Sequence, residues 1–122
     1  MKFKISVTDY FSAAHNLREY QGKCEKLHGH NFKVKVTVGS KRLDKTGMVA
    51  DFHYLKDALH LVLKPLDHSY LNKLPFFQTA NPTSENVAQF IFKEIRKSLK
   101  TGHKLLEVSV WENETNEASC EG

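Results

Sequence analysis

The chain has 122 residues, which is enough for one domain but not for two, so residues 1–122 are expected to form a single domain. Hydrophobic residues make up 40% and charged residues 26% of the chain, which is typical of a globular protein and argues against a disordered or fibrous one. The net charge of +4 fits either a lysine-coated surface or a substrate that carries phosphates.

The sequence also bears on partners and location. No run of Lys and Arg reaches the length of a nucleic-acid-binding tail, and no segment approaches the ~18 apolar residues of a membrane span. Residues 1–20 show no apolar stretch after a basic start, so we expect no signal peptide. We therefore expect a cytoplasmic protein with reduced thiols at Cys24 and Cys120, and with neither nucleic acid nor membrane among its partners.

Two segments near the start of the chain alternate with a period of two, which predicts half-buried strands. In residues 3–15, one parity carries Phe3, Ile5, Val7, Phe11, Ala13 and His15. In residues 28–38, one parity carries His28, His30, Phe32, Val34, Val36 and Val38. The following residues, 39–45, are predicted to form a turn, and Met48–Phe52 a short strand.

Two later segments have the period of a helix. Residues 54–64 carry an apolar stripe that Pro65 ends, and a loop is predicted over residues 66–82. Thr83 is a good N-cap for a second helix, which Gly102 is placed to terminate. The apolar stripes consist of Leu55, Ala58, Leu59, Val62 and Leu63 in the first helix, and of Val87, Phe90, Ile91, Ile95 and Leu99 in the second.

Residues 105–112 alternate again and complete the predicted architecture. Strands at both ends with helices between them indicate an α+β fold, in which two helices cover one face of a four-stranded antiparallel sheet. The open edges of such a sheet must be covered, charged or paired with another chain, and strand pairing between subunits is one solution.

The strongest local feature is His28-Gly29-His30, a spacing that puts both imidazoles on one face of a strand. That face is apolar, so the imidazoles need polar partners, which one shared metal ion would supply. His15 ends the preceding strand in phase with its apolar residues, and it reaches the same point if the strands form a hairpin. Three neutral imidazoles with an open fourth position are typical of catalytic zinc. Alternatively, these are buried histidines that bind no metal.

Cys24 lies four residues before His28 and has three interpretations. A thiol near a metal ion or an imidazolium is more acidic than usual and can act as a base. Alternatively, Cys24 is a small buried hydrophobic residue, or it is a fourth zinc ligand that closes a structural site.

Two carboxylates are candidates for the same site. Asp67 and His68 are adjacent and could present a carboxylate and an imidazole together, or they form an ordinary polar loop. Glu112 is in phase with Leu106, Val108 and Val110. It either accepts two parallel N–H groups from a ligand, such as a guanidinium or the amino-pyrimidinone edge of a pterin, or it lies in solvent beyond the end of the strand.

Five motifs together resemble the 6-pyruvoyl-tetrahydropterin synthase family. They stand in order from about Phe3 to Glu112, at fitting spacing, and their joint presence is far more specific than any one of them. The motifs are Cys24-Glu-Lys-Leu-His28-Gly-His30-Asn-Phe, Gly47-Met-Val-Ala-Asp-Phe52, Pro65-Leu-Asp67-His68, Asn81-Pro-Thr-Ser-Glu-Asn86 and Val110-Trp-Glu112.

The resemblance implies the tunnelling fold, in which the sheets of three subunits join into a barrel and two trimers stack into a homo-hexamer. It implies that His15, His28 and His30 hold Zn²⁺. It also implies that Cys24 is the base, with Asp67-His68 as its proton relay, and that Glu112 anchors the pterin. Thr83 and Ser84 match a segment that lines the pterin pocket. The family substrate is dihydroneopterin triphosphate, a small molecule that suits the basic charge balance.

The length of one gap separates two branches of the family. Only Glu25, Lys26 and Leu27 lie between Cys24 and His28, which is similar to 6-carboxy-5,6,7,8-tetrahydropterin synthases of queuosine biosynthesis rather than to the longer-gapped animal synthases. The resemblance therefore implies a carbon–carbon lyase. Its alternatives are a 6-pyruvoyl-tetrahydropterin synthase and a non-catalytic zinc- or pterin-binding module. The residues after Glu112 depart from the family pattern, in which a threonine usually follows this glutamate.

Overall fold

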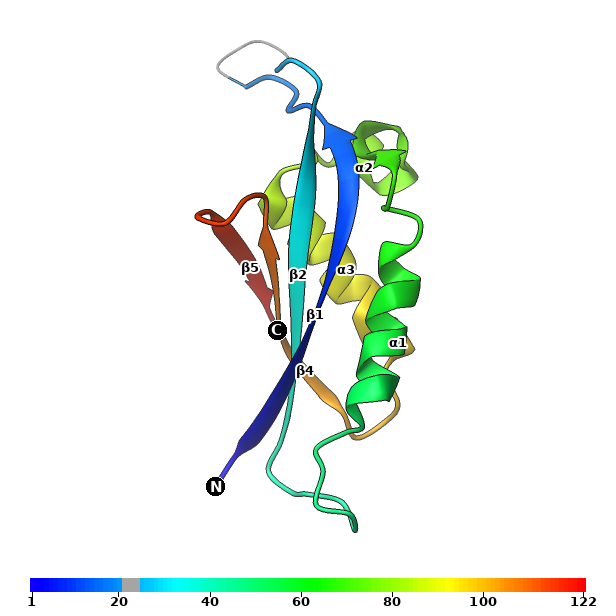
Figure 1. Cartoon of the computed structure of the whole chain (residues 1–122), viewed down its shortest axis with the longest axis vertical. Helices are drawn as coiled ribbons and strands as arrows, with labels where there is room; N and C mark the ends of the chain where they lie inside the picture. Colours follow the sequence, from blue (N-terminus) through cyan, green and yellow to red (C-terminus); the bar gives the residue numbers. More distant parts are fainter. Residues whose placement is uncertain (21–24) are drawn as a thin grey trace.

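The computed structural model describes residues 1–20 and 25–122, which form a five-stranded sheet with helices on one face (Figure 1). In the sheet order β3-β1-β2-β4-β5, the strands are β1 (Phe3–His15), β2 (His28–Ser40), β3 (Ser69–Tyr70), β4 (Lys104–Trp111) and β5 (Glu117–Glu121). The helices are α1 (Phe52–Leu63), α2 (Pro75–Thr79) and α3 (Ser84–Ser98), with a 3-10 turn η1 at Leu71–Lys73. The α+β class is confirmed. Among the described residues, the expected four strands and two helices are corrected to five strands and three α-helices.

The long hairpin of β1 and β2 sets the register of the sheet. The two strands pair antiparallel without a break from Phe3↔Ser40 to His15↔His28. Because directly paired residues lie on the same face, the predicted alternation of both strands produces one continuous apolar surface. Most of that surface is fully buried, as are the matching positions of β4.

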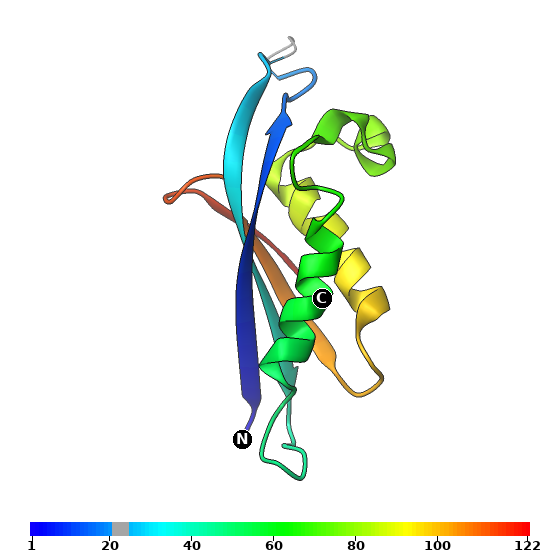
Figure 2. The ribbon, with the colours of Figure 1, turned by 45° about the vertical axis from the view of Figure 1, so that its right-hand side comes forward.

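Helices α1 and α3 cover this apolar face, as Figure 2 shows. Each helix begins at a side-chain cap, since Asp51 accepts from the His53 N–H (2.7 Å) and Thr83 accepts from the Asn86 N–H (3.1 Å). Five residues on each helix are buried: Leu55, Ala58, Leu59, Val62 and Leu63 on α1, and Val87, Ala88, Ile91, Phe92 and Ile95 on α3. None of the helices in residues 1–20 and 25–122 is long and apolar enough to cross a membrane.

The expected strand over Met48–Phe52 is wrong. The Asp44 carboxylate accepts from the N–H groups of Thr46 (2.9 Å) and Met48 (3.0 Å), which closes a turn there. The Asp44 side chain thus binds the Met48 N–H, which in a strand would donate to a neighbouring strand. The cap at Asp51 also explains why α1 begins at Phe52 rather than at the expected Tyr54.

The segment predicted as a loop, residues 66–82, contains β3, η1 and α2. Pro75 lies in the first turn of α2, where a missing N–H costs nothing, and Phe77 anchors that short helix in the core. Helix α3 ends at Ser98, so Gly102 does not terminate it. Instead, Gly102 has a φ of +99° in the turn that leads into β4.

The residues after β4 form an additional strand. The Asn113 side chain accepts from the N–H groups of Thr115 (3.0 Å) and Asn116 (2.9 Å), so the chain reverses and β5 pairs antiparallel with β4. The unusual sequence after Glu112 therefore encodes a hairpin at one edge of the sheet.

Candidate metal centre

Three histidines meet at one end of the β1–β2 hairpin. His15 pairs directly with His28, and Ala13 pairs with His30, so all three imidazoles lie on the face that the helices cover. The ring centroids of His15 and His28 are 4.6 Å apart, as are those of His28 and His30. The predicted proximity of the three side chains is therefore present in the fold.

Backbone carbonyls fix the orientation of two of these rings. His15 Nδ1 lies 2.8 Å from the carbonyl oxygen of Pro82, and His28 Nδ1 lies 2.9 Å from that of Lys26. A carbonyl oxygen only accepts, so each Nδ1 carries the proton and donates it. Each Nε2 is consequently left with a free lone pair, as a metal ligand requires.

Burial also favours a free lone pair on Nε2 of His15, whose side chain is about 2% exposed. Desolvation lowers the pKa of His15, because burial penalises the imidazolium, although the hydrogen bond to Pro82 works in the opposite direction. The neutral imidazole is favoured, and this is the form that binds metal ions.

Glu112 joins the cluster from the end of β4, the strand that pairs with β2. It is the first residue after β4, and its Oε1 atom lies 2.7 Å from Nε2 of His30 and 3.9 Å from Nε2 of both His15 and His28. Its side chain is about 31% exposed, so Glu112 is neither fully buried nor freely solvated. One ligand atom from each of the four residues lies within 4.8 Å of the other three.

The chemistry of this cluster fits a metal ion. Within the described part of the chain, Nε2 of His15 and Nε2 of His30 are buried and have no hydrogen-bond partner, despite the short contact between His30 and Glu112. Buried polar atoms without partners are costly, and a shared cation would satisfy both of them. Three imidazoles with one carboxylate are ligands that suit zinc.

The Asp67-His68 pair lies at the β3 edge of the sheet. Asp67 Oδ1 accepts from the Ser12 N–H (2.9 Å), which holds the pKa of the Asp67 carboxyl below its usual range. Asp67 Oδ2 is 3.0 Å from His68 Nδ1, so the two side chains can share a proton. His68 and His30 both line a cavity of about 460 Å³, together with Ser12, Ala13, Ala14, Gly29, Asn31 and Ser69.

The other expected site residues differ in how the structure places them. Thr83 caps α3, and its hydroxyl is occupied there. Ser84 donates to Glu112 Oε2 (3.3 Å) and so contacts the cluster directly. Cys24, which the sequence suggested as a base, lies outside the described residues. The carbonyl partners Pro82 and Lys26 were not foreseen, because a backbone acceptor leaves no side-chain signal in a sequence.

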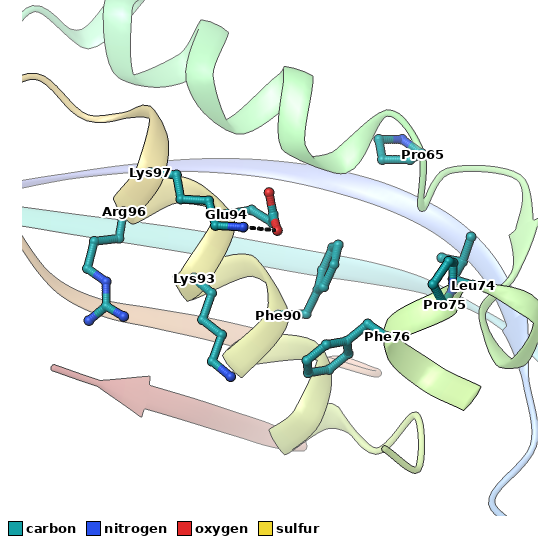
Figure 3. Close-up of a pocket in the computed structure, with 9 residues that line it drawn as sticks. All are labelled: Pro65, Leu74, Pro75, Phe76, Phe90, Lys93, Glu94, Arg96 and Lys97. Carbon is teal, nitrogen blue, oxygen red and sulfur yellow. Dashed lines mark hydrogen bonds and ion pairs between the residues drawn. The ribbon is translucent and has the colours of Figure 1, made fainter. Parts of the chain in front are cut away.

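A separate groove lies on the outer surface of the helices, between the end of α1, α2 and α3 (Figure 3). It has a volume of about 650 Å³ and is lined by Pro65, Leu74, Pro75, Phe76, Phe90, Lys93, Glu94, Arg96 and Lys97. Among the described residues that line it, Glu94 is the one carboxylate, and it is paired with Lys97 at 3.2 Å. This lining offers no set of metal ligands, so the histidine cluster is the candidate centre.

The fold and the cluster together define an α+β protein with a histidine-rich candidate metal centre at the end of a long hairpin. The family profile described as 6-pyruvoyl tetrahydropterin synthase matches residues 4–122, and the chain belongs to this family. This membership confirms the resemblance drawn from the sequence motifs.

Individual relatives carry more than one name. The chain is 44% identical to a 6-carboxy-5,6,7,8-tetrahydropterin synthase of Synechocystis, over 80% of the chain and 78% of the relative. It is 41% identical to a dihydroneopterin monophosphate aldolase of Pyrococcus furiosus, over 92% of the chain and 91% of the relative. Among solved structures, it is similar to a 6-pyruvoyl tetrahydropterin synthase of Caenorhabditis elegans, with a TM-score of 0.88 and 30% identity. The match covers 100% of the chain and 96% of that structure. The expectation of an enzyme similar to 6-carboxytetrahydropterin synthases is thus confirmed.

Proposed function

We propose that this chain is a zinc-dependent 6-carboxy-5,6,7,8-tetrahydropterin synthase of queuosine biosynthesis. It would convert 7,8-dihydroneopterin triphosphate and water to 6-carboxy-5,6,7,8-tetrahydropterin, acetaldehyde and triphosphate. The observation that carries the proposal is the cluster of His15, His28, His30 and Glu112, in a chain that is 44% identical, over 103 aligned residues, to a synthase of that name.

Each site residue has a role in this proposal. His15, His28 and His30 would hold zinc, which supplies a Lewis acid for the oxygens of the substrate side chain. Cys24 would take a proton from that side chain, and Asp67 with His68 would carry protons to and from it. The lowered pKa of Asp67 supports the relay, because an ionised carboxylate stabilises the imidazolium of His68.

Glu112 would anchor the pterin ring, and Thr83 and Ser84 would line its pocket. A carboxylate can accept two parallel N–H groups from the amino-pyrimidinone edge of a pterin. Ser84 already donates to Oε2 of Glu112, which leaves Oε1 as the atom that faces the histidines. The proposed anchor and the proposed metal ligands are therefore close enough to act on one substrate.

We also propose that the protein works as a homo-hexamer of the tunnelling fold, in the cytoplasm. The sheet of the single chain supports this assembly, because β3 and β5 lie at its two edges. Strand edges that end a sheet can pair with another chain. Joining three such sheets would close the barrel that the family resemblance implies.

The product distinguishes this proposal from its alternatives. Incubation with dihydroneopterin triphosphate should give 6-carboxytetrahydropterin and acetaldehyde in equal amounts, because one carbon–carbon bond breaks in each turnover. Mass spectrometry of the pterin, with acetaldehyde trapped as a hydrazone, measures both. Stoichiometric 6-pyruvoyl-tetrahydropterin without acetaldehyde would instead assign the animal-type reaction, in which all side-chain carbons are kept.

The aldolase name of the Pyrococcus relative supports a second candidate, since that relative aligns with 92% of the chain. An aldolase acting on dihydroneopterin monophosphate would break a carbon–carbon bond and keep the phosphate on the smaller fragment. Parallel incubations with the monophosphate and the triphosphate therefore separate the two candidates. No turnover of either compound by the zinc-loaded protein would leave a non-catalytic binding module.

Glu112→Gln tests the proposed pterin anchor. The substitution keeps the shape of the side chain but exchanges one acceptor oxygen for a donor. Loss of a charge-assisted hydrogen bond costs ~1.5–3 kcal/mol, so pterin affinity measured by calorimetry should fall by roughly 10–150-fold. Zinc content should be retained. Loss of zinc from this variant, with pterin affinity unchanged once zinc is restored, would make Glu112 a metal ligand rather than an anchor.

A further inference from the structure

Two asparagine side chains hold the segment that follows β1 in the same way. Asn72 donates to the carbonyl of Asn16 (2.8 Å) and accepts from its N–H (3.0 Å). Asn81 donates to the carbonyl of Arg18 (3.0 Å) and accepts from its N–H (2.8 Å). Each side-chain amide thus pairs with a backbone residue as a neighbouring strand would. Both paired residues lie within three positions of His15 on the chain.

The Arg18 side chain strengthens the second of these pairs. Its Nη2 atom donates to the carbonyl of Phe77 (2.5 Å) and to that of Ala80 (3.0 Å). Hydrogen bonds from a charged guanidinium are stronger than those between neutral groups. Four hydrogen bonds therefore connect Arg18 to residues 77–81.

Within residues 81–84, two residues contact members of the metal cluster. The Pro82 carbonyl accepts from His15, and the Ser84 hydroxyl donates to Glu112. Between them, Thr83 caps α3. The Asn86 side chain donates to the Asn81 carbonyl (2.8 Å), so residue 81 is held through its backbone as well as its side chain. Any shift of Asn81 would move the Pro82 carbonyl, which is the acceptor that orients His15.

We propose that Asn81, supported by Arg18, is a positioning residue for the metal centre. It fixes the Pro82 carbonyl, which keeps the proton of His15 on Nδ1 and directs Nε2 towards His28 and His30. The inference rests on the metal site of the proposed function, although its effect on His15 does not require the metal. Residues that orient a metal ligand from behind typically contribute 10–100-fold to metal affinity.

Asn81→Ala and Asn72→Ala form a matched pair, because each removes one amide that pairs with the backbone after β1. Zinc affinity, measured by competition with a chelator, should fall by ~10–100-fold in Asn81→Ala and stay close to wild type in Asn72→Ala. Equal losses in both variants would show that only the position of the strand end matters, and would overturn the proposal. If Asn81→Ala does not fold, Arg18→Met takes its place in the test. This substitution removes the two hydrogen bonds of the Arg18 side chain but keeps those between the Arg18 backbone and Asn81.

A second readout needs no metal. Nitrogen NMR of the histidine rings, in metal-free protein above the titration range of imidazole, reports which nitrogen carries the proton. His15 should be the Nδ1–H tautomer in the wild type and in Asn72→Ala, and should become a mixture of tautomers in Asn81→Ala. An unchanged Nδ1–H tautomer in Asn81→Ala would sink the inference. A wild type that shows this tautomer but binds no zinc would count against the proposed function instead, and would leave the role of Asn81 intact.

Discussion

His28→Ala should remove most of the zinc from this protein. The proposed site has three imidazole ligands, and two of them remain in the variant. Loss of an outer-shell partner already costs 10–100-fold in metal affinity, so loss of a direct ligand should cost more. Zinc per chain, measured by elemental analysis after dialysis against a weak chelator, should fall far below one.

His28 is the best of the three ligands to replace, because its side chain is about 32% exposed whereas that of His15 is about 2% exposed. Truncating His28 therefore disturbs the core less than truncating His15 would, and a loss of zinc can be assigned to the missing ligand. His60→Ala is the matched control, since the exposed His60 lies on α1 and takes no part in the cluster. Full zinc occupancy in His28→Ala would rule out the three-histidine assignment.

The part of the site that could be predicted from sequence is the part that period-two alternation encodes. Alternation put His28 and His30 on one face of a strand, and the phase of His15 put it on the matching face of its neighbour. The hairpin register then brought these residues together, because His15 pairs directly with His28. Glu112 was in phase with the same face, and it joins the cluster from the end of β4.

The elements that sequence reasoning missed are short and depend on local side-chain bonds. A periodic pattern needs several residues to be visible, and β3, η1 and α2 contain 2, 3 and 5 residues. The second edge strand, β5, depends on a turn that the Asn113 side chain closes. Conversely, a strand was expected at Met48–Phe52, where the Asp44 carboxylate accepts from the Met48 N–H that a strand would have used.

The groups that orient the histidines are invisible in the sequence for another reason. Every residue has a carbonyl, so nothing distinguished Pro82 or Lys26 as a partner of a ring nitrogen. Asn81 was part of the motif that carried the family resemblance, but its pairing with Arg18 depends on two segments about sixty residues apart. Such contacts follow from tertiary structure, and only the structure could show them.

Cys24→Ala should abolish turnover and leave zinc in place. A general base contributes ~10²–10⁴ to the rate, so kcat should fall by that factor. Cys24 itself lies outside the described residues, and the prediction rests on its place in the sequence, where only three residues separate it from His28. Glu25 donates its N–H to the Leu17 carbonyl (2.8 Å) and accepts from the Leu17 N–H (3.2 Å), just beyond the end of β1. At ~3.3–3.6 Å per residue, the four steps from Cys24 to His28 span at most ~14 Å.

Cys120→Ala is the matched control, because Cys120 is a half-buried free cysteine on β5 that lies outside the cluster. The kcat and zinc content of Cys120→Ala should equal those of the wild type.

Cys24→Ser provides a further test, since a hydroxyl fills nearly the same volume but is far harder to deprotonate than a thiol. If Cys24 only packs against its neighbours, the serine variant should stay active, and the proposed base would be wrong. If Cys24→Ala loses its zinc along with its activity, Cys24 is a fourth ligand of a structural site, because a base that does not touch the metal cannot change metal affinity to that extent.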